Sequence, residues 1–172
     1  MLTTALSLLT LATGCSDVSA ATRSSLYDAD ASIRLEALYQ MGPAEKITRL
    51  PRLIIMAEGD PISDVQYTAL ALLGTTGSPD AVPTLHRKLH DSSDTDGQII
   101  AARALGALSN VEACSAMVEA WVQWIEPTTD YVALELRDSL VRSRSACQKV
   151  VRSQVREHPE RLRPIMGDMT RA

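Results

Sequence analysis

The stretch VQYTALALLG at residues 65–74 decides the fold, because it recurs in altered form at a fixed spacing along the chain. The corresponding stretches are IRLEALYQMG at 33–42, GQIIAARALG at 97–106 and TDYVALELRD at 129–138. All four have Ala at the fifth position, the first three end in Gly, and both columns advance by 32 residues. Self-similarity at such a period indicates stacked structural repeats rather than a single globular core.

Each block has the pattern of an amphipathic helix. In the second block the first, fifth and ninth positions, Val65, Ala69 and Leu73, fall on one helical face. An Asp precedes each of the four expected helices, where its carboxylate can accept hydrogen bonds from the free N–H groups of the first turn. These residues are Asp30, Asp60, Asp94 and Asp130. We expect the Gly of the first three blocks, as at Gly74 and Gly106, to end the helix in the left-handed conformation.

A second helical segment is expected after each Gly, at 43–57, 79–90 and 110–125, so that the helices come in pairs. The paired blocks resemble HEAT repeats, in particular the short type also found in phycobilin lyases. Ile33-Arg34 and the sequence DAVPTL at 80–85 match that family well, whereas Gln66 and Gln98 stand where it usually has Arg. The resemblance covers residues 28–143 and implies an all-α fold, a right-handed α-solenoid of about four HEAT-like helix pairs. Tetratricopeptide repeats are the alternative, but their 34-residue period and their Trp, Gly and Tyr columns are not reproduced.

The beginning of the chain carries a different signal. No charged residue occurs from Leu2 to Gly14, and this apolar run is shorter than the roughly 20 residues that a membrane-spanning helix needs. Its length fits the apolar region of a secretory signal. The sequence LATGC at 11–15 resembles the lipobox of bacterial lipoproteins. That resemblance implies that residues 1–14 are a signal peptide that is removed, and that Cys15 is lipidated as the new N-terminus.

Two features depart from the lipoprotein pattern. Ala12 stands where that family usually has Leu, and no Lys or Arg precedes the apolar run. The alternative is an apolar first helix that ends at Gly14 with a buried Cys15. Within the lipoprotein interpretation, Ser16 rather than Asp after the Cys favours the outer membrane. We therefore expect a lipid-anchored protein on the periplasmic face of a bacterial outer membrane.

Charge is distributed unevenly along the chain. Residues 1–136 contain 8 basic and 17 acidic residues, whereas the remaining 36 contain 9 basic and 4 acidic ones. The net charge of −4 gives no electrostatic reason to expect nucleic-acid binding. We expect residues 15–27 to form the anchor, a linker and a first partial helix. Residues 144–172 should form a basic capping helix, broken at Pro159 and Pro164, whose outer face can also contact an anionic surface.

No motif for chemistry stands out. The chain has no P-loop, GxGxxG, GxSxG or CxxC motif, so we predict no enzyme activity, no cofactor and no metal site. His86 and His90 have a spacing that can suit a metal, but we interpret them as part of a solvated helix face. Cys114 and Cys147 fall on successive helices, and stacked helices lie 8–10 Å apart, while a disulfide needs Cα atoms within about 7 Å. We therefore predict two small buried residues.

The third position of each block offers a candidate binding surface. It lies about 160° from the Ala column on a helical wheel, so it points away from the core. Four large residues occupy it: Leu35, Tyr67, Ile99 and Tyr131. The seventh position adds Tyr39 and Arg103, and aromatic residues with Arg are typical of interface hot spots. The alternative is that these side chains are wedged between adjacent repeats.

The HEAT resemblance implies that such a surface lies on the concave side and binds a protein partner, whose identity the sequence does not give. The second functional hypothesis is a soluble cytoplasmic HEAT-repeat adaptor, or a chromophore-binding protein like the phycobilin lyases.

Overall fold

The computed structural model describes residues 25–123 and 130–171, and the chain divides into two units, residues 1–41 and 42–172. The predicted signal peptide and Cys15 lie outside the described residues. The described part of the first unit contains helix α2 (Ala31–Tyr39). Asp30 caps it as predicted, because its carboxylate accepts a hydrogen bond from the N–H of Ser32 at 2.8 Å. Arg34 donates to the carbonyl oxygens of Asp28 and Ala29, which holds the approach to the helix.

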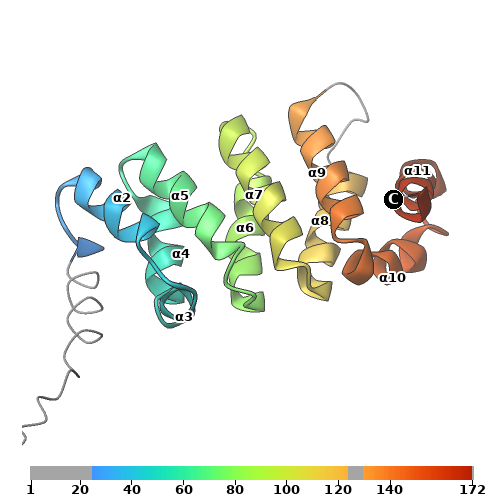
Figure 1. Cartoon of the computed structure of the whole chain (residues 1–172). Helices are drawn as coiled ribbons and strands as arrows, with labels where there is room; N and C mark the ends of the chain where they lie inside the picture. The colour runs from blue at the N-terminus through green and yellow to red at the C-terminus, as the bar shows by residue number, and fades with distance from the viewer. Residues whose placement is uncertain (1–24, 124–129, 172) are drawn as a thin grey trace, which may run out of the picture. The chain divides into compact units, whose positions relative to one another are not determined.

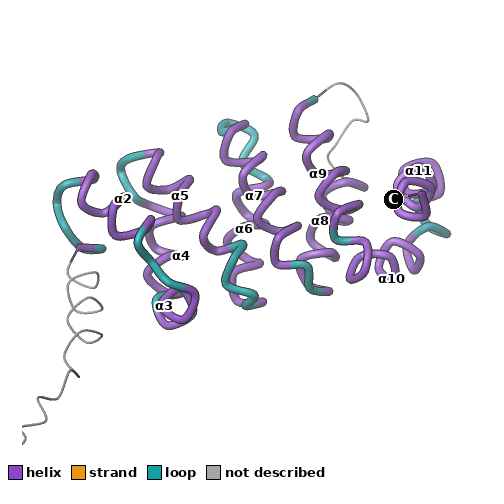
Figure 2. Tube along the Cα trace, in the orientation of Figure 1, coloured by secondary structure: helices purple, strands orange, loops and turns teal. Residues whose placement is uncertain are grey.

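The described part of the second unit is helical and contains no strand. Its helices are α3 (Pro43–Thr48), α4 (Leu50–Gly59), α5 (Ser63–Leu73), η1 (Pro79–Ala81), α6 (Val82–Leu89), α7 (Thr95–Leu108), α8 (Val111–Gln123), α9 (Tyr131–Arg142), α10 (Arg144–Gln154) and α11 (Pro159–Arg171). Short loops connect most of them (Figure 2). The helices and the absence of strands in the described part confirm the predicted all-α solenoid. No membrane-spanning helix is found among the described residues.

Two layers of helices build the solenoid (Figure 1). One layer contains α5, α7 and α9, and the other contains α4, α6 and α8, with α4 packed on α5, α6 on α7 and α8 on α9. The core lies between the layers, and Val65, Ala69 and Leu73 are completely buried in it, as the period predicts. Each Leu-sized side chain removed from water in this way stabilises the fold by about 1.5–3 kcal/mol.

The four Asp residues that precede the expected helices accept hydrogen bonds at the helix starts, as predicted. The Asp94 carboxylate accepts from the N–H of Gly97 at 2.9 Å, and that of Asp130 accepts from the N–H of Val132 at 3.1 Å. The carboxylate of Asp60 accepts from the N–H of Ile62, just ahead of α5. Satisfying these free donors fixes where each helix begins.

The prediction for the Gly column is wrong. Gly74 has φ −61°, which is right-handed, and Gly106 lies inside α7. A Cβ at Gly74 would lie 2.6 Å from the Cα of Ala104, and one at Gly106 would lie 2.8 Å from the Cβ of Ser139. The missing side chain therefore lets α5 approach α7, and α7 approach α9, more closely than any other residue would permit. A glycine in the left-handed region does occur, at Gly77 with φ 69°, in the turn after α5.

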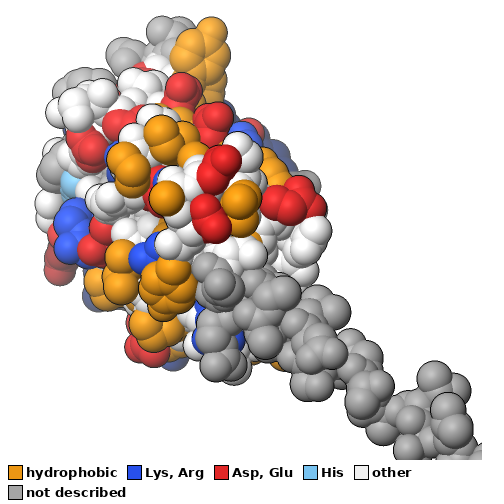
Figure 3. Space-filling view, turned by 90° about the vertical axis from the view of Figure 1, so that its left-hand side faces the viewer, with side chains coloured by type: hydrophobic (Ala, Val, Ile, Leu, Met, Phe, Trp, Pro, Cys, Tyr) orange, Lys and Arg blue, Asp and Glu red, His pale blue; other side chains and the backbone are white. Residues whose placement is uncertain are grey.

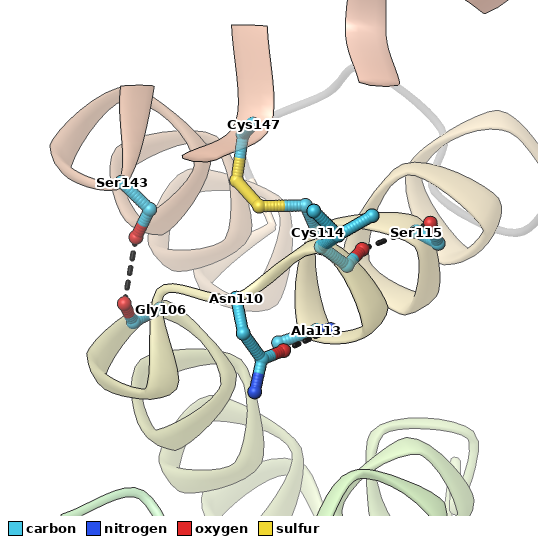
Figure 4. Close-up of a disulfide and its surroundings, with 8 residues drawn as sticks. Gly106, Asn110, Ala113, Cys114, Ser115, Ser143 and Cys147 are labelled. Carbon is cyan, nitrogen blue, oxygen red and sulfur yellow. Dashed lines mark hydrogen bonds between the residues drawn. A yellow bond between two sulfur atoms is a disulfide. The ribbon is translucent and has the colours of Figure 1, made fainter. Parts of the chain in front are cut away.

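The two cysteines are buried as predicted, but the prediction that they do not pair is wrong, because Cys114 on α8 and Cys147 on α10 form a disulfide (Figure 4). Both residues are completely buried, and their Cα atoms lie 5.1 Å apart. The spacing of 8–10 Å refers to helix axes, whereas Cα atoms lie about 2.3 Å from the axis. Residues that face each other are therefore about 4.6 Å closer than the axes, which is within the range of a disulfide.

The C-terminal helices follow the prediction in part. Val151 of α10 is buried, and Pro159 begins α11, but Pro164 lies inside α11 and does not break it. Leu162, Ile165 and Met169 form the buried face of α11. The indole N–H of Trp121 donates to the carbonyl oxygen of Arg161 at 3.0 Å, and this bond ties α11 to α8.

Candidate partner-binding face

The predicted surface residues fall into two groups. Leu35 and Tyr39 belong to α2 in the first unit, where Leu35 is half-buried and Tyr39 is 71% exposed. Tyr67, Ile99, Arg103 and Tyr131 lie on α5, α7 and α9 in the second unit, and we call this layer the α5–α7–α9 face. Its residues are the ones that the structure brings together.

Tyr67 takes part in packing between repeats. Its side chain is half-buried, and its hydroxyl donates to Asp94 Oδ1 at 2.7 Å, a bond that raises the pKa of the tyrosine. Burial alone would raise the pKa of Asp94, but hydrogen bonds from Lys88, from the N–H of Gly97 and from Tyr67 hold it below its ordinary value. Tyr67 thus joins α5 to the start of α7. Its side chain agrees with the alternative interpretation of this position, in which it is wedged between adjacent repeats.

Tyr131 has the opposite character. It is 74% exposed at the start of α9, and Leu134, one turn further along, is 47% exposed. Ile99 is half-buried between these extremes. The third position of the blocks is therefore not uniform: it contributes to packing at Tyr67 and presents an aromatic ring to solvent at Tyr131.

Arg103 lies on the surface and is paired within the protein. Its guanidinium donates to Glu135 Oε2 at 2.7 Å, and Arg142 donates to the other oxygen of the same carboxylate at 2.6 Å. Burial alone would raise the pKa of Glu135, but these two hydrogen bonds hold it below its ordinary value. Arg103 and Glu135 occupy the same position of consecutive blocks, so the pair links one repeat to the next. The side chain of Arg103 remains 63% exposed and can still donate outward.

Leu134 lines a pocket of about 320 Å³ to which α8, α9 and α11 all contribute, so no single stretch of the sequence could have predicted it. Leu134 and Trp121 belong to its apolar lining, and Arg137, which also lines it, is paired with Asp168. Its lining residues are Trp121, Ala133, Leu134, Arg137, Glu160, Arg161 and Pro164. We call Tyr131, Leu134 and this pocket the α9 end of the face.

Exposed apolar residues also occur elsewhere on the described surface. Ile55 on α4 and Val111 at the start of α8 are each 58% exposed. In the view of Figure 3, hydrophobic side chains are interspersed with acidic and basic side chains. Scattered exposure of this kind is normal for a soluble surface. The α9 end differs because one of its exposed apolar side chains, Leu134, lines a pocket.

The two histidines of α6 are less solvated than the sequence predicted. His86 and His90 are both half-buried, and their Nε2 atoms are 2.9 Å apart. Glu119 Oε2 on α8 lies 3.8 Å from Nε2 of His86. Burial, and then the neighbouring His86, lower the pKa of His90. The described residues contain no cluster of three or more His, Cys, Asp or Glu residues that could hold a metal ion.

A family model described as HEAT repeats matches residues 50–136, half of the chain. The chain therefore belongs to the HEAT-repeat family, as its period, its layers and its close helix contacts also indicate. No curated protein matches the sequence. HEAT repeats form scaffolds for protein interaction and are typically not enzymes, and this protein has the architecture of such a scaffold.

Proposed function

We propose that the protein is a lipid-anchored HEAT-repeat scaffold on the periplasmic face of a bacterial outer membrane, and that it binds a protein partner through the α5–α7–α9 face. The observation that carries the binding proposal is the α9 end, where Leu134 is exposed and lines an apolar pocket, and where exposed Tyr131 lies one turn before Leu134 on the same helix. Large aromatic and apolar side chains beside a pocket are the features that interface hot spots share. Arg103, exposed on the same face, supplies a donor for a polar partner group.

Export is supported by two independent features. The sequence before Cys15 has the apolar run and small residues of a lipoprotein signal. Cys114 and Cys147 form a disulfide, and disulfides persist in oxidising compartments such as the periplasm, whereas reduced thiols prevail in the cytosol. A lipid on Cys15 would hold the scaffold at the membrane, since each buried CH₂ contributes about 0.8 kcal/mol.

The anchor is tested by the intact mass of the protein from the membrane fraction of cells that express the full chain. We expect a chain without residues 1–14 that carries a diacyl or triacyl group on Cys15. The matched variant Cys15→Ala should keep residues 1–14 and carry no acyl group. An unmodified full-length wild-type chain in the cytosol would contradict the proposal.

The binding face is tested by site-specific photocrosslinking in the same membranes, with the photoreactive group at Arg103. Tyr131→Ser should abolish the crosslinked band, because loss of a hot-spot residue costs about 2 kcal/mol or more, roughly a 30-fold weaker Kd. Ile55→Ser on the opposite layer is the matched control, since it removes a similarly exposed apolar side chain. Equal crosslinking in wild type and Tyr131→Ser would exclude the α9 end as the interface.

A further inference from the structure

The ring nitrogens of His86 and His90 converge, although helical spacing alone does not require it. One turn of α6 separates the residues, and the two Nε2 atoms lie 2.9 Å apart with the ring planes at 76°. An imidazole at the surface of a helix can adopt several rotamers, and some of them would hold these nitrogens apart. Here the two Nε2 atoms lie within hydrogen-bond distance of each other.

That separation defines an angle at a bound ion. Imidazole nitrogens bind first-row metals at about 2.0–2.1 Å, so two nitrogens 2.9 Å apart subtend about 90° at an ion bound to both. A tetrahedral ion needs about 109°, hence nitrogens roughly 3.3–3.4 Å apart. An angle near 90° is that between neighbouring ligands in the square-planar or tetragonal coordination of copper(II) and nickel(II). Of these two, copper(II) binds nitrogen ligands more tightly.

We propose that His86 and His90 form a copper(II) chelate through their Nε2 atoms. Since the described residues hold no cluster of three or more ligands, water fills the remaining positions. In the free protein one Nε2–H donates to the other ring. For both rings to coordinate, that proton moves to Nδ1 of the donor ring, so the number of bound protons does not change.

Glu119 places a negative charge beside the two imidazoles. Its Oε2 lies on the neighbouring helix α8, 3.8 Å from Nε2 of His86. A carboxylate at that distance favours a divalent cation electrostatically and can bind one of its water ligands. The site thus spans two repeats, and it depends on neither the lipid anchor nor the partner face.

The test is a titration of the full chain, without a polyhistidine tag, with copper(II) sulfate. All proteins carry Cys15→Ser, so that a free thiol cannot reduce the ion. We expect electron paramagnetic resonance to show one copper(II) with two nitrogen ligands. His86→Asn and His90→Asn should each weaken binding more than about tenfold, since even changes in outer-shell partners cost 10–100-fold. Glu119→Gln should weaken it by less than about tenfold.

His158 lies outside the site and supplies the matched control, because His158→Asn removes one imidazole and should leave copper affinity unchanged. A second measurement is the Tm, which saturating copper(II) should raise in wild type and His158→Asn but not in His86→Asn. Circular dichroism shows whether each variant is folded before titration. Equal affinities of wild type and His86→Asn, or a single nitrogen ligand in the spectrum, would overturn the proposal.

Discussion

The repeats from α4 to α9 and the C-terminal helices α10 and α11 are held in place by different means. In the repeats each helix buries several apolar side chains; α7 alone buries Ala101, Ala102, Ala104, Leu105 and Leu108. Helix α10 buries only Cys147 and Val151, and most of its other residues are polar or basic. The first of these two residues is covalently bonded to α8.

This difference shows how a repeat protein can end. Where the repeat pattern fades, apolar burial between helices falls, and a covalent bond together with ion pairs takes over. Arg137 of α9 pairs with Asp168 of α11, next to the disulfide-linked helix. Each terminal helix of a solenoid has a neighbour on one side only, so it depends more on such individual links than an internal helix does.

Removal of the disulfide should have the largest effect. For a loop of 33 residues, the loss of its constraint on the unfolded chain corresponds to about 3–4 kcal/mol, or roughly 10 °C in Tm. We expect this loss for the double variant Cys114→Ala/Cys147→Ala in a Cys15→Ser background, measured by urea unfolding. Hydrogen exchange should rise first in α10 and α11. Equal acceleration in α5 would show that the two regions are not held differently.

Filling the close helix contacts should have the next largest effect. Gly74→Ala places a methyl group against the Cα of Ala104, and overpacking of this kind costs about 1–3 kcal/mol. Gly59→Ala is the matched control, because a Cβ there meets nothing within 4 Å and reduces the entropy of the unfolded chain. Its free energy of unfolding should stay the same or rise by up to about 1 kcal/mol. Equal changes in the free energy of unfolding for the two variants would contradict close helix approach as the reason for Gly at position 74.

A smaller effect is expected at the junction between α5 and α7. Tyr67→Phe removes the hydroxyl that donates to Asp94 and should cost about 1 kcal/mol in unfolding free energy. Tyr131→Phe removes the hydroxyl of an exposed ring and should change stability by less than about 0.5 kcal/mol. A loss of stability at Tyr131 equal to that at Tyr67 would place both rings between repeats.

The surface ion pairs should have the smallest effect, and one that depends on pH. The pKa of Asp168 is lowered by hydrogen bonds from Arg137 and Arg171, and that of Glu135 is lowered despite burial. Their contribution to stability is complete above the ordinary values of 3.8 and 4.5, and it is lost as the pH falls through the lowered values. Asp168→Asn should therefore cost up to about 1 kcal/mol at pH 7 and less at pH 3. A larger cost at pH 3 would contradict the assigned pairing.

The fold was largely predictable from the sequence because the helical pattern that determines it recurs every 32 residues. Three exact spacings of 32 residues predicted that Val65, Ala69 and Leu73 lie in the core. The Asp residues that precede the expected helices predicted where the helices start. Gly74 was misinterpreted because glycine serves two purposes, a left-handed helix end and a close helix contact. Only the position of Ala104 on the next helix tells them apart.

Much of the candidate site could not be predicted, since it depends on contacts between distant segments. The pocket of the α9 end combines Trp121, Leu134 and Pro164 from three helices, and no spacing in the sequence links them. The spacing of His86 and His90 was visible, but Glu119 comes from another repeat. Tyr67 and Tyr131 occupy equivalent positions of their blocks. The hydroxyl of Tyr67 donates a hydrogen bond to Asp94, whereas Tyr131 is largely exposed.

The disulfide also determines how the chain would respond to mechanical tension. Cys114 and Cys147 close a covalent loop that contains the whole of α9. If the protein were pulled by its two ends, force would run from α8 through the sulfur–sulfur bond into α10. The 33 residues of the loop, which would measure about 110–120 Å when fully extended, could then add no length to the stretched chain. Tyr131 and its helix would stay unloaded while the repeats before them were drawn out.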